Sequence, residues 1–199
     1  MLRPRFALIA VALLIGCGLS ASRARAGYIV TLAQQGNGVV ATGTGPIDLT
    51  GLTFFATVST PVEMQPNGAI IITGAPLTNG FEDLYGGFIT GPTNFGSGTN
   101  TTADSGMGDL VGISTSAFVF VPAGYVSGSP LSDSATYNNA TFASLGVTPG
   151  TYEWTWGTGP NQNFTLIAVP EPSVSVLLVI GILLAGISLR QLCSRSGAA

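Results

Sequence analysis

Between Gly27 and Ala168 the chain alternates short runs of β-branched and aromatic residues with turn-forming glycine, asparagine and proline. This pattern is typical of an all-β protein with many turns. Runs that fit strands lie at 28–34, 39–45, 53–58, 69–73, 109–114, 117–121, 151–156 and 163–169. About eight to ten short strands at this spacing predict a β-sandwich, jelly-roll-like or similar.

Several of these segments carry more detailed predictions. The first two runs flank the turn sequence QGNG and predict a hairpin. Residues 117–121 are apolar on both sides, which predicts a central, buried strand. The glycine-dense stretch from Gly86 to Gly112 predicts a long loop with no clear strand before Asp109. NNATFASLG is the one helix candidate, of one or two turns that end at Gly146.

Basic residues occur only near the two ends of the chain, and the chain has no histidine or lysine. They are Arg3, Arg5, Arg23, Arg25, Arg190 and Arg195. Between Gly27 and Ala168 there are eight acids and no cation, a formal charge of −8. These acids are Asp48, Glu63, Glu82, Asp83, Asp104, Asp109, Asp133 and Glu153.

This distribution excludes several classes of function for the central region. Nucleic-acid binding needs cations that replace phosphate counterions, and phosphate-bearing substrates are disfavoured for the same reason. Catalysis by Ser-His-Asp or Cys-His is impossible without histidine, and zinc loses its two best ligand types. Cys17 and Cys193 both lie near the ends, so disulfides cannot stabilise the region between them.

The N-terminal segment has the parts of a signal peptide. Arg3 and Arg5 precede an apolar run over residues 6–19, and Ala24 and Ala26 provide the small residues of a signal peptidase site. We expect a signal peptide over 1–26, with cleavage after Ala26. One alternative is an uncleaved membrane anchor. Another is lipidation at Cys17 of the box LIGC, which we interpret as a chance match because it falls inside the apolar run.

The C-terminal segment predicts a membrane span. Residues 174–189 hold no charge, Ser173 extends the run, and a helix over about 173–189 just reaches across a bilayer core. Arg190 and Arg195 follow, and because positive charge stays on the cytoplasmic side, the region before the span is expected outside the membrane. A plain single-span anchor is the simplest alternative.

Pro170, Glu171 and Pro172 precede this span, and the two prolines keep the segment extended and accessible to a processing enzyme. The order of parts from Val169 to Arg195 resembles the PEP-CTERM sorting signal of Gram-negative bacteria: a Pro-Glu-Pro motif, a transmembrane helix and an arginine-containing tail. The resemblance implies recognition by an exosortase, a membrane protease-transpeptidase, with removal of the span. It also implies a link to exopolysaccharide and biofilm. The tail departs from the family pattern because it has two arginines instead of a dense cluster.

The acids offer candidate calcium ligands. The pair Glu82-Asp83, and Asp104 with Asp109, could bind calcium with help from Asn94 and Asn100. Their spacing matches no calcium loop, so we interpret them as solvated surface acids and expect no metal or cofactor.

Carboxylates, aromatic residues and asparagines in the central region offer three further candidate sites, each with a simpler interpretation. A glycosidase needs two facing carboxylates, and the spacing of Glu82 and Glu153 does not support a pair. Tyr152, Trp154 and Trp156 share one strand face and could stack on sugar rings, but aromatics at period two are more often core residues. The N-glycosylation patterns at residues 100–102, 139–141 and 163–165 are interpreted as accidental in a bacterial protein.

The sequence therefore predicts a signal peptide over 1–26, an extracytoplasmic domain over 27–168 and a sorting signal over 169–199. We expect an exported, non-enzymatic protein of the cell surface or extracellular matrix, with a structural or adhesive role. Expected partners are signal peptidase, the secretion translocon, the exosortase and an exopolysaccharide. The alternatives are a carbohydrate-binding module with a specific glycan and exposed aromatics, and a simple membrane-anchored surface domain.

Overall fold

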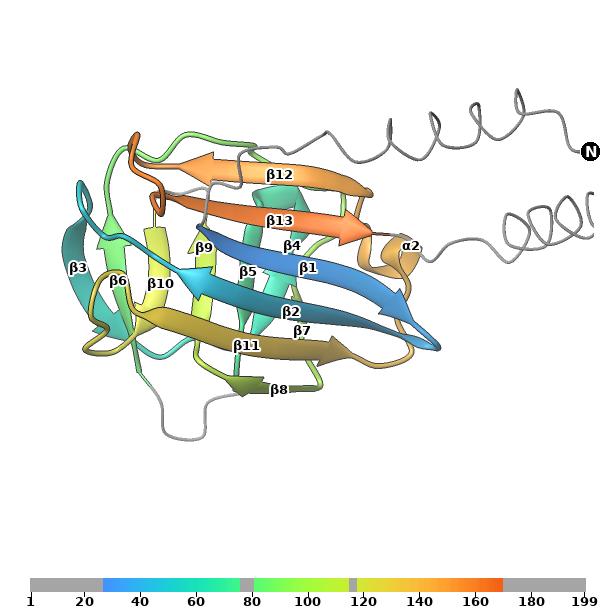
Figure 1. The fold of residues 1–199 in the computed structure, drawn as a ribbon. Coiled ribbons are helices and arrows are strands. Elements are labelled where there is room, and N and C mark those ends of the chain that lie inside the picture. Colours follow the sequence, from blue (N-terminus) through green and yellow to red (C-terminus); the bar gives the residue numbers. More distant parts are fainter. Residues whose placement is uncertain (1–26, 76–80, 115–117, 170–199) are drawn as a thin grey trace, which may run out of the picture.

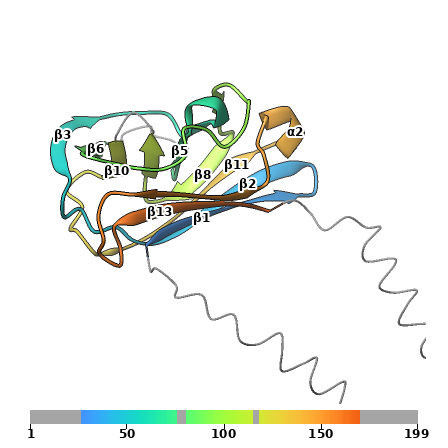
Figure 2. The same cartoon turned by 90° about the horizontal axis from the view of Figure 1, so that it is seen from above.

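Two β-sheets pack face to face and account for most of the structure (Figures 1 and 2). The computed structural model describes residues 27–75, 81–114 and 118–169. Thirteen strands and two single-turn helices form in this part of the chain. The predicted all-β class is confirmed.

The six-stranded sheet contains both the first and the last strand of the described chain. Its order is β12 (Gly150–Thr155), β13 (Asn163–Val169), β1 (Tyr28–Gln35), β2 (Gly38–Pro46), β11 (Pro130–Tyr137) and β8 (Ser105–Gly108). β1 and β2 form the predicted antiparallel hairpin, whereas β1 and β13 pair in parallel. The parallel pairing places the first and last strands side by side in the sheet, with Tyr28 at one end of the pair and Val169 at the other.

The seven-stranded sheet is built from shorter strands, all paired antiparallel. Its order is β3 (Thr53–Val58), β6 (Glu82–Gly86), β10 (Phe118–Pro122), β9 (Val111–Ser114), β5 (Ile70–Thr73), β4 (Glu63–Gln65) and β7 (Thr101–Thr102). β10 lies between two neighbours, and its residues 119–121 are buried. The prediction of a central, buried strand at this point is confirmed.

The helical elements are short. The 3-10 helix η1 spans Pro66–Gly68, and the α-helix α2 spans Phe142–Leu145. Thr141 caps α2 by accepting a hydrogen bond from the backbone N–H of Ser144, and Gly146 ends it with a left-handed φ of 65°. The helix predicted to end at Gly146 is therefore confirmed, as a single turn.

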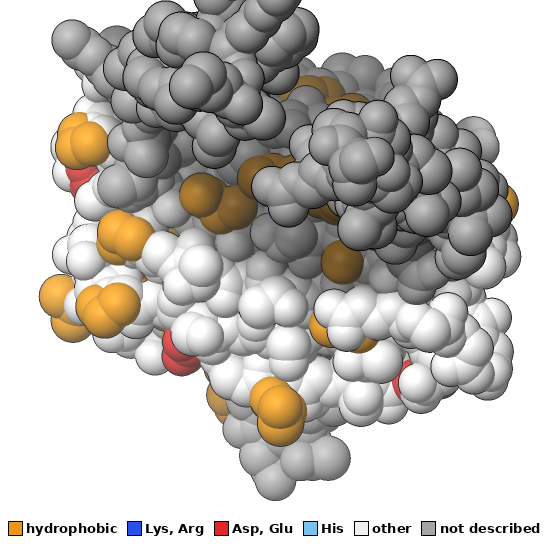
Figure 3. Space-filling model, turned by 45° about the vertical axis from the view of Figure 1, so that its right-hand side comes forward, with side chains coloured by type: hydrophobic (Ala, Val, Ile, Leu, Met, Phe, Trp, Pro, Cys, Tyr) orange, Lys and Arg blue, Asp and Glu red, His pale blue; other side chains and the backbone are white. Residues whose placement is uncertain are grey.

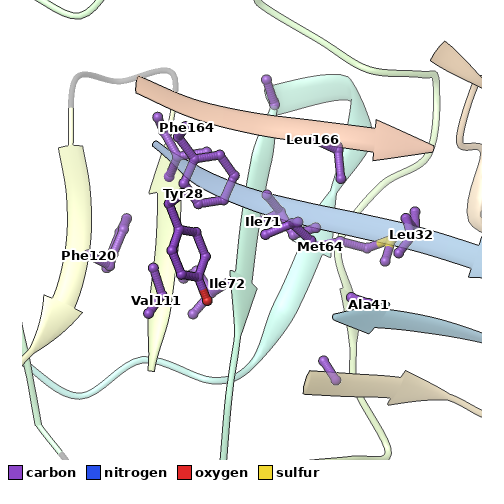
Figure 4. Packing of buried hydrophobic residues seen from close by; sticks show 14 of the residues in the cluster. Tyr28, Leu32, Ala41, Met64, Ile71, Ile72, Val111, Phe120, Phe164 and Leu166 are labelled. Carbon is purple, nitrogen blue, oxygen red and sulfur yellow. The ribbon is translucent and has the colours of Figure 1, made fainter. Parts of the chain in front are cut away.

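The core between the sheets follows from alternation along the strands. On β1, Tyr28, Val30 and Leu32 are fully buried, and the residues between them are partly exposed. Figure 4 shows Tyr28 and Leu32 beside side chains of the opposite sheet, among them Val111 and Met64. Because this region has no cysteine, such apolar packing holds the two sheets together.

Five strands were not predicted from the sequence, and the count of eight to ten was too low for this reason. They are β4, β6, β7, β8 and β11. The inward side of β11 is formed by Leu131, Asp133, Ala135 and Tyr137, and the carboxylate in this row hides its alternation. The loop predicted over 86–112 was wrong in part, because β7 and β8 lie within it. These two strands form by backbone pairing with β4 and β11.

No helix in the described ranges is long and apolar enough to cross a membrane. The signal peptide expected over 1–26, with Ala24 and Ala26, lies outside the described residues. So do the sorting motif Pro170, Glu171 and Pro172, the span expected over about 173–189, and the anchor charges Arg190 and Arg195.

Candidate functional site

The outward side of the six-stranded sheet is a broad surface rich in threonine and serine. Thr31 on β1 lies opposite Thr42 on β2, which lies opposite Ser134 on β11. Equivalent cross-strand rows lie on either side. We call this surface the hydroxyl face. Its rows are Glu153, Thr165, Ile29, Thr44 and Ser132; Thr151, Ile167, Thr31, Thr42, Ser134 and Met107; and Val169, Ala33, Val40, Thr136 and Ser105.

The hydroxyl face is almost free of charge. None of its residues is buried, and Glu153 is its one charged member. The Glu153 carboxylate accepts a hydrogen bond of 3.1 Å from the Asn163 side-chain amide. The other members carry hydroxyl, methyl or short aliphatic groups, apart from Met107. On the side of the molecule drawn in Figure 3, the coloured residues include few acidic and no basic side chains.

A second exposed surface lies along one end of the seven-stranded sheet. Four phenylalanines are largely exposed on β3 or just beyond the two ends of the β3–β6 pair: Phe54 (52%), Phe55 (68%), Phe81 (61%) and Phe88 (85%). The first two belong to β3, the terminal strand of the sheet, and the other two flank its neighbour β6. We call these four residues the aromatic edge.

A β-bulge sets the orientation of the two phenylalanines on β3. Phe54 is in register with Tyr85 and Ala56 with Leu84, so Phe55 is the extra residue. The Phe54 ring packs edge-on against Tyr85 at 5.8 Å between centroids, and the Phe55 ring packs against Phe118 at 5.0 Å. Both rings are thus held in place while most of their surface stays exposed.

The acids beside the aromatic edge are withdrawn from solvent. Asp83 is 8% exposed; its carboxylate accepts hydrogen bonds from the Thr57 hydroxyl at 2.6 Å and the Gly124 N–H at 2.8 Å. Glu82 is fully buried and accepts a hydrogen bond from the Thr60 hydroxyl. Burial raises the pKa of Glu82, although the Thr60 hydrogen bond opposes the shift. The interpretation of Glu82 and Asp83 as solvated acids was therefore wrong.

The other proposed calcium ligands are engaged locally. Asp104 accepts a hydrogen bond from the Asn138 N–H at 2.7 Å, and Asp109 accepts one from the Ser132 N–H at 2.9 Å. The Asn100 amide donates to Glu63 at 2.8 Å, and Asn94 is exposed on a loop. Within the described ranges, no three acidic or metal-ligating side chains gather into a metal site.

The aromatic row on β12 belongs to the core. Trp154 is 1% exposed and Trp156 is 7% exposed. Their indole N–H groups donate to the carbonyl oxygens of Pro92 at 2.9 Å and Asp48 at 2.7 Å. Tyr152 is half-buried, and its hydroxyl donates to the Thr148 carbonyl. The core interpretation is confirmed, and the idea of a sugar-stacking platform here is wrong.

The two carboxylates considered for a glycosidase lie on different sheets, and the three asparagines of the glycosylation patterns differ in exposure. Glu153 is exposed on the six-stranded sheet, whereas Glu82 is buried in the seven-stranded sheet, so the two carboxylates do not face each other across a cleft. Asn100 and Asn139 are exposed. Asn163 is 3% exposed, which makes its amide inaccessible in the folded chain.

A third buried carboxyl group, that of Asp133, lies in the core between the two sheets. Asp133 is 5% exposed and accepts a hydrogen bond from the hydroxyl of the fully buried Tyr28. Burial raises the pKa of Asp133 to about 6, with a smaller rise from Asp109; the hydroxyls of Tyr28 and Thr73 oppose it. Burial, together with the Asp133 carboxylate, also raises the pKa of Tyr28. This pair is a polar contact in the interior and is not open to a ligand.

Comparison with known proteins identifies no relative. No protein-family model matches the chain, and neither a curated protein nor a solved structure matches it significantly. Function must therefore be inferred from the two exposed surfaces.

Both surfaces have a signal in the sequence that the strand predictions did not include. Thr31, Thr42 and Thr44 alternate with buried residues in the first hairpin, which points to one threonine-rich outer face. The adjacent pair Phe54-Phe55 breaks period two and is the sign of a bulge with an outward aromatic ring.

Proposed function

We propose that this chain is an exported, non-enzymatic protein of the cell surface or extracellular matrix, and that its β-sandwich adheres to neutral polysaccharide through the hydroxyl face. The observation that carries the proposal is the composition of that face: sixteen residues from six strands, with one charge among them. The acids of the domain lie elsewhere or are buried, with the exception of Glu153.

The regular spacing of a sheet suits a repeating polymer. Neighbouring strands lie about 4.8 Å apart, and alternate residues on one strand about 6.7 Å apart. The hydroxyl face therefore presents a lattice of hydroxyl and methyl groups. Hydroxyls can hydrogen-bond to sugar hydroxyls, and the methyl groups of threonine, valine and isoleucine can contact the apolar faces of sugar rings.

Charge favours a neutral polymer over an acidic one. The region from Gly27 to Ala168 has a formal charge of −8 and no cation. An acidic polysaccharide would be repelled, unless calcium bridged the two.

The proposed location of the protein rests on its two terminal segments. The resemblance of residues 169–195 to the PEP-CTERM signal supports recognition by an exosortase, and residues 1–26 support export through the translocon and signal peptidase. The expected location is first the inner membrane and then the cell surface or matrix. A simple membrane-anchored surface domain is the alternative if the C-terminal segment is retained.

The test is co-sedimentation of the purified full-length protein with insoluble neutral polysaccharides such as cellulose and chitin. Thr42→Lys places a charge in the centre of the hydroxyl face, between the uncharged Thr31 and Ser134. Thr102→Lys is the matched control, because Thr102 is exposed on β7 of the other sheet and lies opposite Glu63.

We expect Thr42→Lys to reduce binding several-fold and Thr102→Lys to leave it unchanged. If neither polymer binds, or if both variants bind like the wild-type protein, the hydroxyl face is not the adhesive surface.

The aromatic edge favours a second candidate, a carbohydrate-binding module with one specific glycan. This candidate predicts exposed aromatic side chains, and Phe54, Phe55 and Phe88 satisfy that condition. It further predicts saturable binding of a soluble oligosaccharide that is lost in Phe55→Lys and kept in Thr42→Lys.

A further inference from the structure

We propose that two copies of this chain associate edge to edge through β3, with the aromatic edge at the contact. This interface is separate from the hydroxyl face, which lies on the other sheet. Four features support it: the backbone of β3, its side chains, the placement of the nearby acids and the position of β3 in the domain.

The backbone of β3 is open to pairing on one side. Among the described strands, β3 hydrogen-bonds only to β6 and ends the seven-stranded sheet. In an antiparallel pair, alternate residues point their N–H and C=O groups away from the partner strand. Residues 53–58 contain no charged residue and no proline, so of the devices that commonly protect such an edge only the bulge at Phe55 is present.

The side chains of β3 present aromatic surface on both faces of the sheet. Tyr85 is in register with Val119, and Phe118 with Gly86, so Tyr85 and Phe118 point to opposite faces. Phe54 contacts the first and Phe55 the second, which places one exposed ring on each side of the edge. A second β3 paired alongside would bury aromatic surface on both faces of the joined sheet.

Electrostatics favours this contact between copies over others. Two copies repel each other because each domain has a formal charge of −8. The acids next to β3 are Glu82 and Asp83, and both are buried. The Thr60 hydroxyl donates a hydrogen bond to Glu82, and the Thr57 hydroxyl donates one to Asp83. Two acidic molecules can therefore meet at β3 without bringing exposed carboxylates together.

The geometry favours a closed dimer instead of a fibre. Antiparallel pairing of β3 with the β3 of a second copy creates a two-fold axis. It occupies the β3 edge of each copy, so no β3 edge remains for a third copy. The bulge at Phe55 twists the edge and opposes long regular pairing, so backbone pairing between two copies is confined to the few residues beside it and the exposed rings supply the rest of the contact. In Figure 1, β3 lies at the opposite end of the domain from Val169, where β13 ends, so attachment through the C-terminal segment leaves β3 accessible.

The test is sedimentation velocity of the purified full-length protein over a wide dilution series. We expect a reversible, weak monomer–dimer equilibrium, because a strand of six residues buries less than a standard interface of about 800 Å² per partner. Phe55→Lys and, separately, Phe88→Lys should raise the dimer dissociation constant about tenfold or more. Both side chains are mostly exposed, so the thermal midpoint should stay close to that of the wild-type protein.

Met107→Lys is the matched control, because Met107 is 72% exposed on β8, an edge strand of the other sheet. It should leave the dimer unchanged, and it also controls for association through the terminal segments, which all variants share. The proposal is overturned if the protein stays monomeric throughout, if Met107→Lys weakens association equally, or if Phe55→Lys abolishes oligosaccharide binding without changing association. The last result would assign the aromatic edge to a sugar.

Discussion

The Tyr28 hydroxyl donates a hydrogen bond to the Asp133 carboxyl group, although the two residues are 105 positions apart. They lie on β1 and β11, which are separated in the sheet by β2. Gly43 on β2 lies directly opposite Asp133, and its missing side chain leaves room for the Tyr28 ring to cross the intervening strand. The polar contact in the core therefore depends on three strands together.

The stability of the domain should fall as the pH rises through about 6. Burial raises the pKa of Asp133 to about 6 from an ordinary value of 3.8, with Asp109 adding to the rise and the Tyr28 and Thr73 hydroxyls opposing it. The folded state thus binds this proton more tightly than the unfolded state. The stabilisation is complete below about pH 4 and is lost as the pH increases past 6, by about 3 kcal/mol at most.

Urea unfolding of the purified protein at a series of pH values measures this effect. In Asp133→Asn the carboxyl group is absent, so most of the pH dependence in this window should disappear; burial of Glu82 contributes a remainder of the same sign. An unchanged pH profile in Asp133→Asn would show that Asp133 does not take up the proton.

Gly43→Ala should destabilise the domain by about 1–3 kcal/mol, because the added methyl group would overlap the Tyr28 hydroxyl and the Asp133 carboxyl oxygen. Gly150→Ala is a suitable control, since a methyl group there would make ordinary contacts of 3.4–3.5 Å with Tyr152. Thermal or urea unfolding of both variants gives the comparison. Equal effects at the two positions would mean that the space above Gly43 is not needed.

Trp154→Ala should lower the free energy of unfolding by about 3–5 kcal/mol, because the indole is buried and its N–H donates to Pro92. Tyr152→Ala should cost much less, since that ring is half-buried. Urea unfolding measures both changes. A stable Trp154→Ala variant that had lost polysaccharide binding would contradict the assignment of this row to the core.

The mass of the C-terminal peptide of the native protein tests the sorting proposal. We expect an end near Pro170–Pro172 in protein recovered from the cell surface or medium. A peptide that continues to Ala199, found only in the membrane fraction, would leave a membrane-anchored surface domain. The hydroxyl face could still bind polysaccharide in that case, so this result is independent of the co-sedimentation test.

Local patterns in the sequence were enough to predict the all-β class, the first hairpin, the central strand expected at residues 117–121 and the turn of helix before Gly146. Each of these depends on neighbouring residues: alternation, a glycine-rich turn, an apolar run or a glycine that ends a helix. The assignment of Trp154 to the core followed from its period-two row in the same way. The near absence of charge in the first hairpin was also visible, although its meaning as part of one face was not.

Which carboxylates are buried and which surfaces are exposed became clear only in three dimensions. Glu82, Asp83 and Asp133 look like surface acids in sequence, because their hydroxyl and amide donors, among them Tyr28, Thr57, Thr60 and Gly124, lie on other segments of the chain. Burial of a carboxyl group becomes tolerable only when such donors are brought to it. Likewise, the exposure of Phe54 and Phe55 depends on β3 being the last strand of its sheet, and strand order is set by long-range pairing, which no local pattern encodes.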